Sequence, residues 1–283
     1  MEIARERGAP AAGTALCGVV LHPAGHTRSP AMHNAAFAAL GIDAVYLAFD
    51  VPPALLAEAI AGARAFGVRQ LAVSIPHKRA VMDHLDEIDA TARRIGAVNT
   101  VTLRDRRLVG ANTDWLGVVR ALERESELKG TRAVVLGAGG TARAAVYGLL
   151  ERGARVAVLN RTVDRARALA DELGAESAGG LADLGDTTHD VLVNTTSVGL
   201  REDASPVDAA AISAGAVVLD AVYEPERTRL LRDASSRGAR AVEGKWMLVH
   251  QAAEQLRLWT GCEAPVEVMA DAFDRAGAGA DGA

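Results

Sequence analysis

Short apolar runs alternate with helix-like segments along almost the whole chain, and this alternation limits the folds open to it. The apolar runs have the length of buried strands, and glycine or proline punctuates the ends of the segments between them. A strand, a helix and a second strand form the unit from which parallel sheets covered by helices are built. We therefore predict an α/β fold with mainly parallel sheets.

The alternation falls into two series, which predict two domains. The first series predicts strands at 15–20, 44–49 and 71–75, helices at 29–40 and 52–66, a charged helix after Pro76, and a pair of strands within 97–113. The second series begins near Arg132 and repeats the strand–helix pattern to about residue 243. The polar segment 122–130 is a candidate connection between the two domains.

Composition narrows the class of protein further. The chain has 283 residues, enough for two ordinary domains, and 49% of them are hydrophobic, which is enough for a packed core. A formal net charge of −5 argues against binding to nucleic acid or to an anionic membrane. Two distant cysteines form no disulfide framework, and seven scattered histidines give no metal-ligand spacing. With no long apolar run, we expect a cytoplasmic protein. The scattered histidines and cysteines lead us to expect no bound metal.

A glycine-rich turn joins the strand at 132–137 to the helix that follows it. Gly137, Gly139 and Ala142 occupy the three small positions of the G-x-G-x-x-A pattern. The first allows a tight turn, the second lets the backbone approach a pyrophosphate, and the third lets helix and strand pack closely. The helix N-terminus also favours phosphate oxygens. The turn therefore predicts a dinucleotide site.

The next strand ends without the acid that usually holds the ribose hydroxyls of NAD. Asn160, Arg161 and Thr162 stand there instead, and Arg165 follows one turn later. A guanidinium cannot accept hydrogen bonds but pairs well with a 2′-phosphate. A solvated Arg161 beside a helix-capping Thr162 is the alternative interpretation. Beside the glycine turn, the stretch favours NADP over NAD.

Polar residues also follow the predicted strands of the first series. Ser74, Lys78, Asn99 and Asp114 lie at or beyond strand ends, where groups of a parallel sheet converge on a cleft. An ammonium can stabilise the charge that develops on a carbonyl oxygen during reduction and can deliver a proton, and a carboxylate can orient it. A surface lysine and a helix-capping aspartate are the alternatives. Gln251, on the helix predicted at 245–259, could face the same cleft or pack incidentally.

Nine ordered motifs identify a family. They are GHTRSPAMHNAAF, VSIPHKRAVM, IGAVNTV, GANTDWLG, VLGAGGTARAA, LNRT, VNTTSVG, DAVYEPERTRLL and GKWMLVHQAAEQLRLWTG, between about Leu16 and Val268. In this order they resemble the shikimate dehydrogenase family. The resemblance implies a substrate-binding and catalytic domain at 14–113, completed by 245–275, and a Rossmann-type NADP domain at 114–244. Residues 1–13 and 276–283 are then expected to be flexible ends. The implied reaction is reversible reduction of 3-dehydroshikimate to shikimate with NADPH.

The resemblance also implies a role for each matching residue. Lys78 and Asp114 match the catalytic pair. Substrate contacts are implied for Thr27, Ser29, Ser74, Asn99, Asp114, Tyr223 and Gln251. Cofactor contacts are implied for Gly137, Ala138, Gly139, Gly140, Thr141, Asn160, Arg161, Thr162, Arg165, Thr195, Val222 and Gly244. His26 and His77 are interpreted as supporting groups.

Three departures from the family pattern leave the substrate open. Thr27 stands where the family usually has serine, and Ala72 and Ser74 replace the usual asparagine and threonine. A changed hydrogen-bonding group can shift discrimination strongly. Quinate, an amino analogue or another cyclohexene carboxylate are alternative substrates, and a non-catalytic NADP sensor is the alternative of another class. The expected partner is a small molecule, with neither nucleic acid nor membrane, and the expected state is a monomer or homodimer.

Overall fold

The computed structural model describes residues 9–25 and 27–278, and the chain divides into two compact units. The first unit contains the residues up to Thr113 and those from Ala252 onward, and the second contains Asp114–Gln251. One boundary precedes helix α4 (Asp114–Glu123), and the other falls inside helix α8 (Gly244–Thr260). The α/β fold with mainly parallel sheets is confirmed.

The first unit is built on a mixed sheet in the order β2-β1-β3-β5-β6-β4. Its elements are β1 (Ala15–Leu21), α1 (Ser29–Leu40), β2 (Ala44–Asp50), η1 (Pro53–Leu55), α2 (Leu56–Phe66), β3 (Gln70–Val73), η2 (Ala80–His84), β4 (Glu87–Ile88), α3 (Ala90–Ile95), β5 (Thr100–Arg104), β6 (Arg107–Ala111) and α9 (Val266–Ala278). β1 pairs in parallel with β2 and β3, whereas β5 is antiparallel to both β3 and β6. The charged helix expected after Pro76 is only the short 3₁₀ turn η2.

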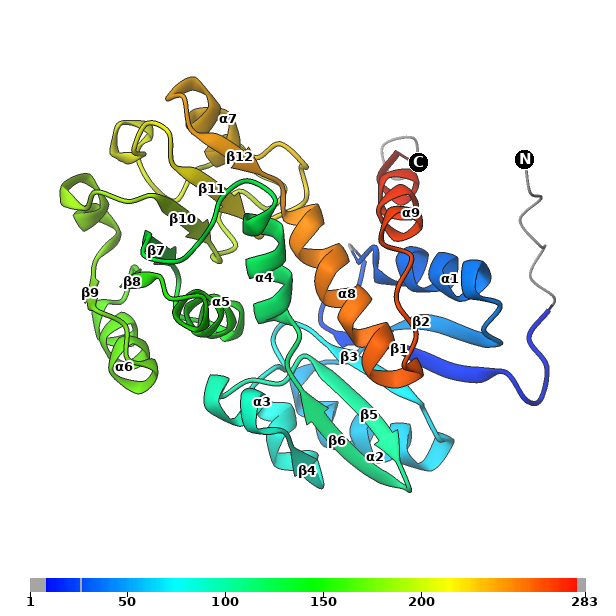
Figure 1. Ribbon diagram of the computed structural model, residues 1–283. Coiled ribbons are helices and arrows are strands. Elements are labelled where there is room, and N and C mark those ends of the chain that lie inside the picture. The colour runs from blue at the N-terminus through cyan, green and yellow to red at the C-terminus, as the bar shows by residue number, and fades with distance from the viewer. Residues whose placement is uncertain (1–8, 26, 279–283) are drawn as a thin grey trace. The chain divides into compact units, whose positions relative to one another are not determined.

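The second unit is a doubly wound sheet whose strands are all parallel, in the order β12-β11-β10-β7-β8-β9 (Figure 1). Besides α4, its elements are β7 (Arg132–Leu136), α5 (Gly140–Glu151), β8 (Arg155–Leu159), α6 (Val163–Leu173), β9 (Ser177–Gly179), η3 (Leu181–Asp186), β10 (Val191–Asn194), η4 (Ala209–Ala211), β11 (Val217–Asp220), α7 (Arg229–Ser236) and β12 (Arg240–Val242), followed by the start of α8. The chain order reverses between β7 and β10, which is the point where such sheets bind ligands.

Alternating strand residues fill the two faces of this sheet. Val135, Val158 and Val193 pack with α4, α5 and α6, whereas Leu136 and Leu192 pack with α7 on the other face. Both faces are therefore covered, and this explains why the strands are apolar along their whole length.

Two sequence-based boundaries need correction. The polar segment 122–130 is not the connection between the units, because Leu122 and Leu128 are buried in the core of the second unit. The chain passes between units at Thr113–Asp114 instead. Residues 276–278 belong to α9, so the flexible tail was predicted to begin too early, at residue 276. The rest of that tail, residues 1–8 and His26 lie outside the described residues.

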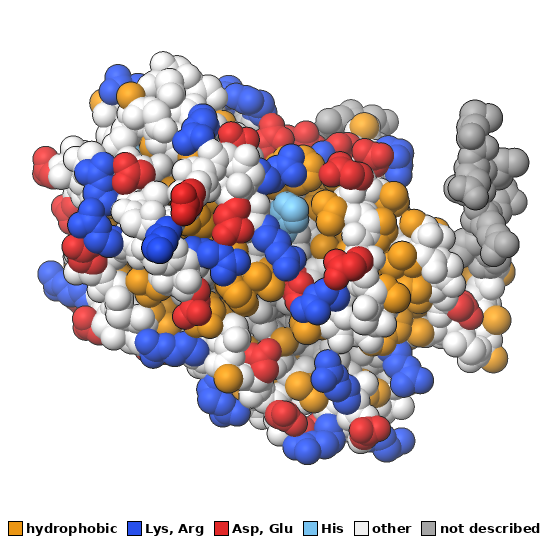
Figure 2. Space-filling view, viewed as in Figure 1, with side chains coloured by type: hydrophobic (Ala, Val, Ile, Leu, Met, Phe, Trp, Pro, Cys, Tyr) orange, Lys and Arg blue, Asp and Glu red, His pale blue; other side chains and the backbone are white. Residues whose placement is uncertain are grey.

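The surface carries charges of both signs. On the face shown in Figure 2, lysine and arginine side chains are interspersed with aspartate and glutamate. Within residues 9–25 and 27–278, none of the helices combines the length and the apolar character that a membrane span requires.

Candidate functional site

One edge of the first unit's sheet gathers the polar residues that the sequence singles out. Ser74 directly follows β3, and its N–H donates to the Val20 carbonyl at 2.9 Å. Asn99 directly precedes β5, and its carbonyl accepts from the Val73 N–H at 2.8 Å. Because β5 and β6 form an antiparallel pair beside β3, the start of β5 and the end of β6 reach the edge where β3 ends. The hairpin brings Asn99 to this edge, rather than parallel strands as predicted.

Lys78 lies in the turn that leaves this edge. Its carbonyl accepts a hydrogen bond from the Val98 N–H at 2.8 Å, so its backbone is fixed directly beside Asn99. The side chain of Lys78 is half-buried. His77 is buried, with its Nε2 2.7 Å from the Val51 carbonyl, and this bond supports the turn. The supporting role expected for His77 agrees with that contact.

The Asn99 side chain is the centre of a buried network. Its Oδ1 accepts from the Thr113 N–H at 2.7 Å and from the Thr100 hydroxyl at 2.8 Å, while its Nδ2 donates to Thr113 Oγ1 at 3.0 Å. The two bonds to Thr113 fix the chain immediately before Asp114, which begins α4 and is buried. Asn99 therefore fixes Thr113, the residue at which the chain leaves the first unit.

Thr27 and Ser29 lie at the start of α1. Ser29 is the first residue of the helix rather than its N-cap, which is Arg28, and among the described residues no side-chain capping bond is formed there. The Thr27 hydroxyl instead accepts from the Ser29 N–H at 3.3 Å. That bond uses the oxygen as an acceptor and leaves the hydroxyl proton to be donated, as a carboxylate ligand requires.

Gln251 lies on α8 where this helix packs tightly against Gly117 of α4. A Cβ on Gly117 would come 2.6 Å from the Met247 carbonyl and 3.0 Å from Gln251 Cβ, so only glycine permits this packing. Asp114 lies one turn before Gly117 on the same face of α4. The helices therefore bring the backbones of Asp114 and Gln251 close together within the second unit.

The carboxyl edge of the second unit's sheet carries every predicted cofactor residue. The glycine turn follows β7, Asn160 follows β8, Thr195 follows β10, and Gly244 begins α8 soon after β12. Gly137 has a φ of +112°, a conformation that side chains disfavour, and a Cβ there would lie 2.6 Å from Thr195 Oγ1. At Gly139, by contrast, no described atom lies within 4 Å of the Cβ position, which leaves the backbone open to a phosphate group.

The residues after β8 form a cationic helix start. Thr162 is the N-cap of α6 by position, yet among the described residues its hydroxyl makes no capping bond. The guanidinium groups of Arg161 and Arg165 are exposed and pair with none of the residues that the structure describes. Asn160 shapes the turn by donating from Nδ2 to the Thr162 carbonyl at 3.0 Å. These unused donors suit a 2′-phosphate, so the residues present fit NADP.

Val222 and Gly244 are held close together beyond β11. A Cβ on Gly244 would come 2.6 Å from the Asp220 carbonyl and 2.7 Å from the Val222 carbonyl. Thr195 is fixed at the neighbouring strand end by its hydroxyl, which donates to the Leu136 carbonyl at 2.7 Å. Tyr223, predicted to contact substrate, follows Val222 and is half-buried.

A buried carboxylate at this edge was missed by the sequence analysis. Asp220 ends β11, is fully buried, and accepts hydrogen bonds from the Thr228 hydroxyl (2.6 Å), Asn194 Nδ2 (2.9 Å) and the Val222 N–H (3.0 Å). Burial raises the pKa of Asp220 to about 6, although the three bonds oppose that rise. An acid that closes the otherwise apolar run AVVLD was the signal that could have identified it.

Comparisons with known proteins agree with this arrangement. Three family models match the chain: the shikimate dehydrogenase substrate binding domain over residues 19–101, shikimate/quinate 5-dehydrogenase over 120–202, and the shikimate 5′-dehydrogenase C-terminal domain over 244–272. A relative from Thermococcus kodakarensis, shikimate dehydrogenase (NADP(+)), is 49% identical over 88% of this chain and 92% of its own.

Solved structures give the same result. The shikimate 5-dehydrogenase of Thermus thermophilus in complex with NADP(H) and shikimate is 40% identical, with a TM-score of 0.88 over 93% of this chain and 100% of that chain. The quinate dehydrogenase of Corynebacterium glutamicum in complex with NAD is 32% identical, with a TM-score of 0.84 over 93% of this chain and 99% of that one.

Proposed function

Because the chain belongs to the shikimate dehydrogenase family, we propose that it is an NADP-dependent oxidoreductase that interconverts 3-dehydroshikimate and shikimate. The observation that best supports NADP as the cofactor is the start of the helix after β8. There Arg161, Thr162 and Arg165 have hydrogen-bond donors without partners among the described residues. A ribose diol needs acceptors at this position, whereas a 2′-phosphate needs donors. The donors therefore favour NADP over NAD.

The glycine turn and the neighbouring strand ends would hold the rest of the dinucleotide. The open backbone at Gly139 and the N-terminus of α5 suit the pyrophosphate, and Thr195, Val222 and Gly244 suit the nicotinamide side. When bound, NADPH supplies the hydride that reduces a ring ketone.

The first unit, the start of α4 and two further residues of the second unit supply the groups for the substrate. Lys78 donates a proton to the carbonyl oxygen as it gains charge, and Asp114 orients the ammonium. The hydroxyl groups of Thr27 and Ser29 donate hydrogen bonds to the substrate carboxylate. Asn99 binds a ring hydroxyl with an amide whose position Thr113 fixes. Ser74, Gln251 and Tyr223 complete the proposed substrate contacts.

Steady-state kinetics with shikimate and with quinate, each with NADP+ and NAD+, tests the function. We expect the highest kcat/KM for shikimate with NADP+. Quinate dehydrogenase is the second candidate, because the family model covers both activities and a quinate enzyme shares the fold. A clear preference for quinate would establish that candidate instead, and binding of NADP+ without turnover of any cyclic hydroxy acid would favour the sensor.

Substitution of Lys78 separates catalysis from binding. We expect Lys78→Ala to lose about a thousandfold in kcat, the scale of general acid catalysis, while its Kd for NADP+ stays within about twofold of the wild-type value. Lys129→Ala, at an exposed lysine of the second unit, is the matched control and should keep normal kinetics. An unchanged kcat in Lys78→Ala would contradict the proposed role. The cytoplasmic location, the oligomeric state and the roles of the two predicted domains stay predictions.

A further inference from the structure

The Asp220 carboxylate joins three segments at the carboxyl edge of the second unit's sheet. It stands at the end of β11 and bonds Asn194 at the end of β10, Thr228 at the start of α7 and the N–H of Val222 in its own loop. Both bonds to the sheet-edge loops use Oδ1, and the bond to Thr228 uses Oδ2. A single buried group therefore determines how these segments meet.

The residues bonded to Asp220 form further hydrogen bonds that fix the neighbouring loops. Asn194 Oδ1 accepts from the N–H (3.0 Å) and the hydroxyl (2.8 Å) of Thr196, which fixes the loop that begins with Thr195. The Asn194 carbonyl accepts from the Ala221 N–H at 2.9 Å, so the two loops are also bonded directly.

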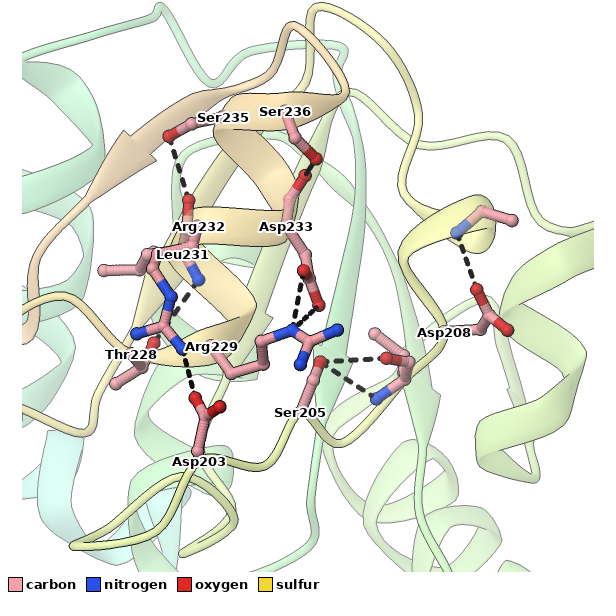
Figure 3. A network of polar contacts seen from close by, with 12 residues as sticks. Asp203, Ser205, Asp208, Thr228, Arg229, Leu231, Arg232, Asp233, Ser235 and Ser236 are labelled. Carbon is pink, nitrogen blue, oxygen red and sulfur yellow. Dashed lines mark hydrogen bonds and ion pairs between the residues drawn. The ribbon is translucent and has the colours of Figure 1, made fainter.

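Thr228 fixes the far end of the second loop. Its hydroxyl accepts from the Leu231 N–H at 3.3 Å and so caps α7 (Figure 3). Farther along α7, Arg232 pairs with Asp203, which ties the helix to the loop between β10 and η4 (Figure 3). The loop 221–227 therefore runs between two points held by the same carboxylate, Val222 and Thr228.

We propose that Asp220 is a positioning residue of the cofactor site, whose hydrogen bonds hold the loops carrying Thr195 and Val222 in place for the nicotinamide. The proposal rests on the proposed NADP-dependent function. Fixed loops reduce the ordering that binding would otherwise require. Gly244 adds a steric limit, because the carbonyls of Asp220 and Val222 lie within 2.7 Å of where its Cβ would be.

Substitutions of Asp220 separate the hydrogen bonds from the charge. In Asp220→Asn, the amide oxygen can accept both bonds that Oδ1 accepts now, and the amide nitrogen can donate to the Thr228 hydroxyl. In Asp220→Ala all three bonds are lost. Asp190→Ala is the matched control, because Asp190 precedes β10 at the opposite edge and also accepts three bonds, all from Arg132.

Two readouts test the proposal in the full-length protein. Hydrogen–deuterium exchange of the free protein should rise in peptides covering 194–199 and 221–228 in Asp220→Ala, but not in Asp190→Ala. By calorimetry, the Kd of NADP+ should rise about tenfold in Asp220→Ala, while 2′,5′-ADP, which lacks the nicotinamide, should bind as to the wild type. In Asp220→Asn, the exchange of these peptides and the Kd of NADP+ should both return to within about threefold of the wild-type values. If Asp220→Ala does not fold, the same two measurements are made on Thr228→Val, which loses the hydroxyl bonded to Asp220, with Thr228→Ser as its control.

The outcomes distinguish this proposal from the proposed function. Unchanged exchange in both loops, or equal weakening of NADP+ and 2′,5′-ADP, would overturn the positioning role even in an active enzyme. Failure of the wild type to oxidise shikimate would overturn the proposed function, while the exchange and NADP+ binding data would still decide the role of Asp220.

Discussion

Asp220→Asn should change how the stability of the second unit depends on pH. In the folded protein the pKa of Asp220 is raised from 3.8 to about 6, mainly by burial. Between these values the folded state holds a proton that the unfolded state has lost, so the free energy of unfolding falls as pH rises. Since one pKa unit corresponds to about 1.4 kcal/mol, this rise in pKa corresponds to about 3 kcal/mol at neutral pH. An asparagine keeps the hydrogen bonds and removes this cost.

Urea denaturation of both proteins across this range measures the effect. Other titrating groups are common to both proteins, so the difference in unfolding free energy isolates Asp220. The advantage of Asp220→Asn should grow by about 2 kcal/mol between about pH 4 and about pH 7, because part of the transition lies below this range. A difference that stays constant with pH would show that the carboxyl group is not held with a raised pKa. A difference of the opposite slope would show that the three hydrogen bonds outweigh burial.

Three further predictions concern single residues. Arg161→Ala should raise KM for NADP+ by about 10-fold to 100-fold and leave KM for NAD+ within about twofold, with Arg167→Ala, on the helix α6 that follows Arg161, as the control. Equal effects on both cofactors would contradict phosphate recognition. Gly137→Ala should lower the unfolding free energy by about 2–4 kcal/mol, through its φ of +112° and the contact with Thr195, as measured by urea denaturation. Asn99→Ala should lower the unfolding free energy by about 1–3 kcal/mol, because its buried bonds to Thr113 are lost, and should also reduce kcat, because the proposed contact with a ring hydroxyl is lost. A normal kcat would limit Asn99 to a structural role.

The sequence predicts the second unit better than the first. Its strands are apolar throughout because both faces of a parallel sheet are buried, so the runs at Arg132–Leu136 and Arg155–Leu159 were recognisable. The glycine turn and Arg161 are adjacent to those strands, and their place in the fold follows from local sequence. Local patterns suffice when neighbours in sequence are also neighbours in the sheet.

The first unit shows where local patterns fail. The charged stretch after Pro76 has helical composition, but the chain forms only the turn η2, because the Lys78 carbonyl is bonded to Val98 instead of to a helical neighbour. The place of Asn99 likewise depends on the antiparallel pairing of β5 with β3. Such pairings join residues distant in sequence, and no short motif reveals them.

Asp190 and Asp220, at opposite ends of the second unit's sheet, affect the stability of the fold in opposite ways. Asp190, before β10, has its pKa lowered to about 2 by hydrogen bonds from Arg132, so its ionised form stabilises the fold. Asp220, at the end of β11, has its pKa raised by burial, so its ionised form costs stability. Packing alone would favour an apolar or amide side chain at that position. Asp220 lies at the edge that carries Gly137, Arg161 and Thr195, where its three hydrogen bonds, which an amide would keep, are the part of this side chain that we infer to serve binding. Its negative charge contributes only the cost to stability, and Asp220→Asn separates the two.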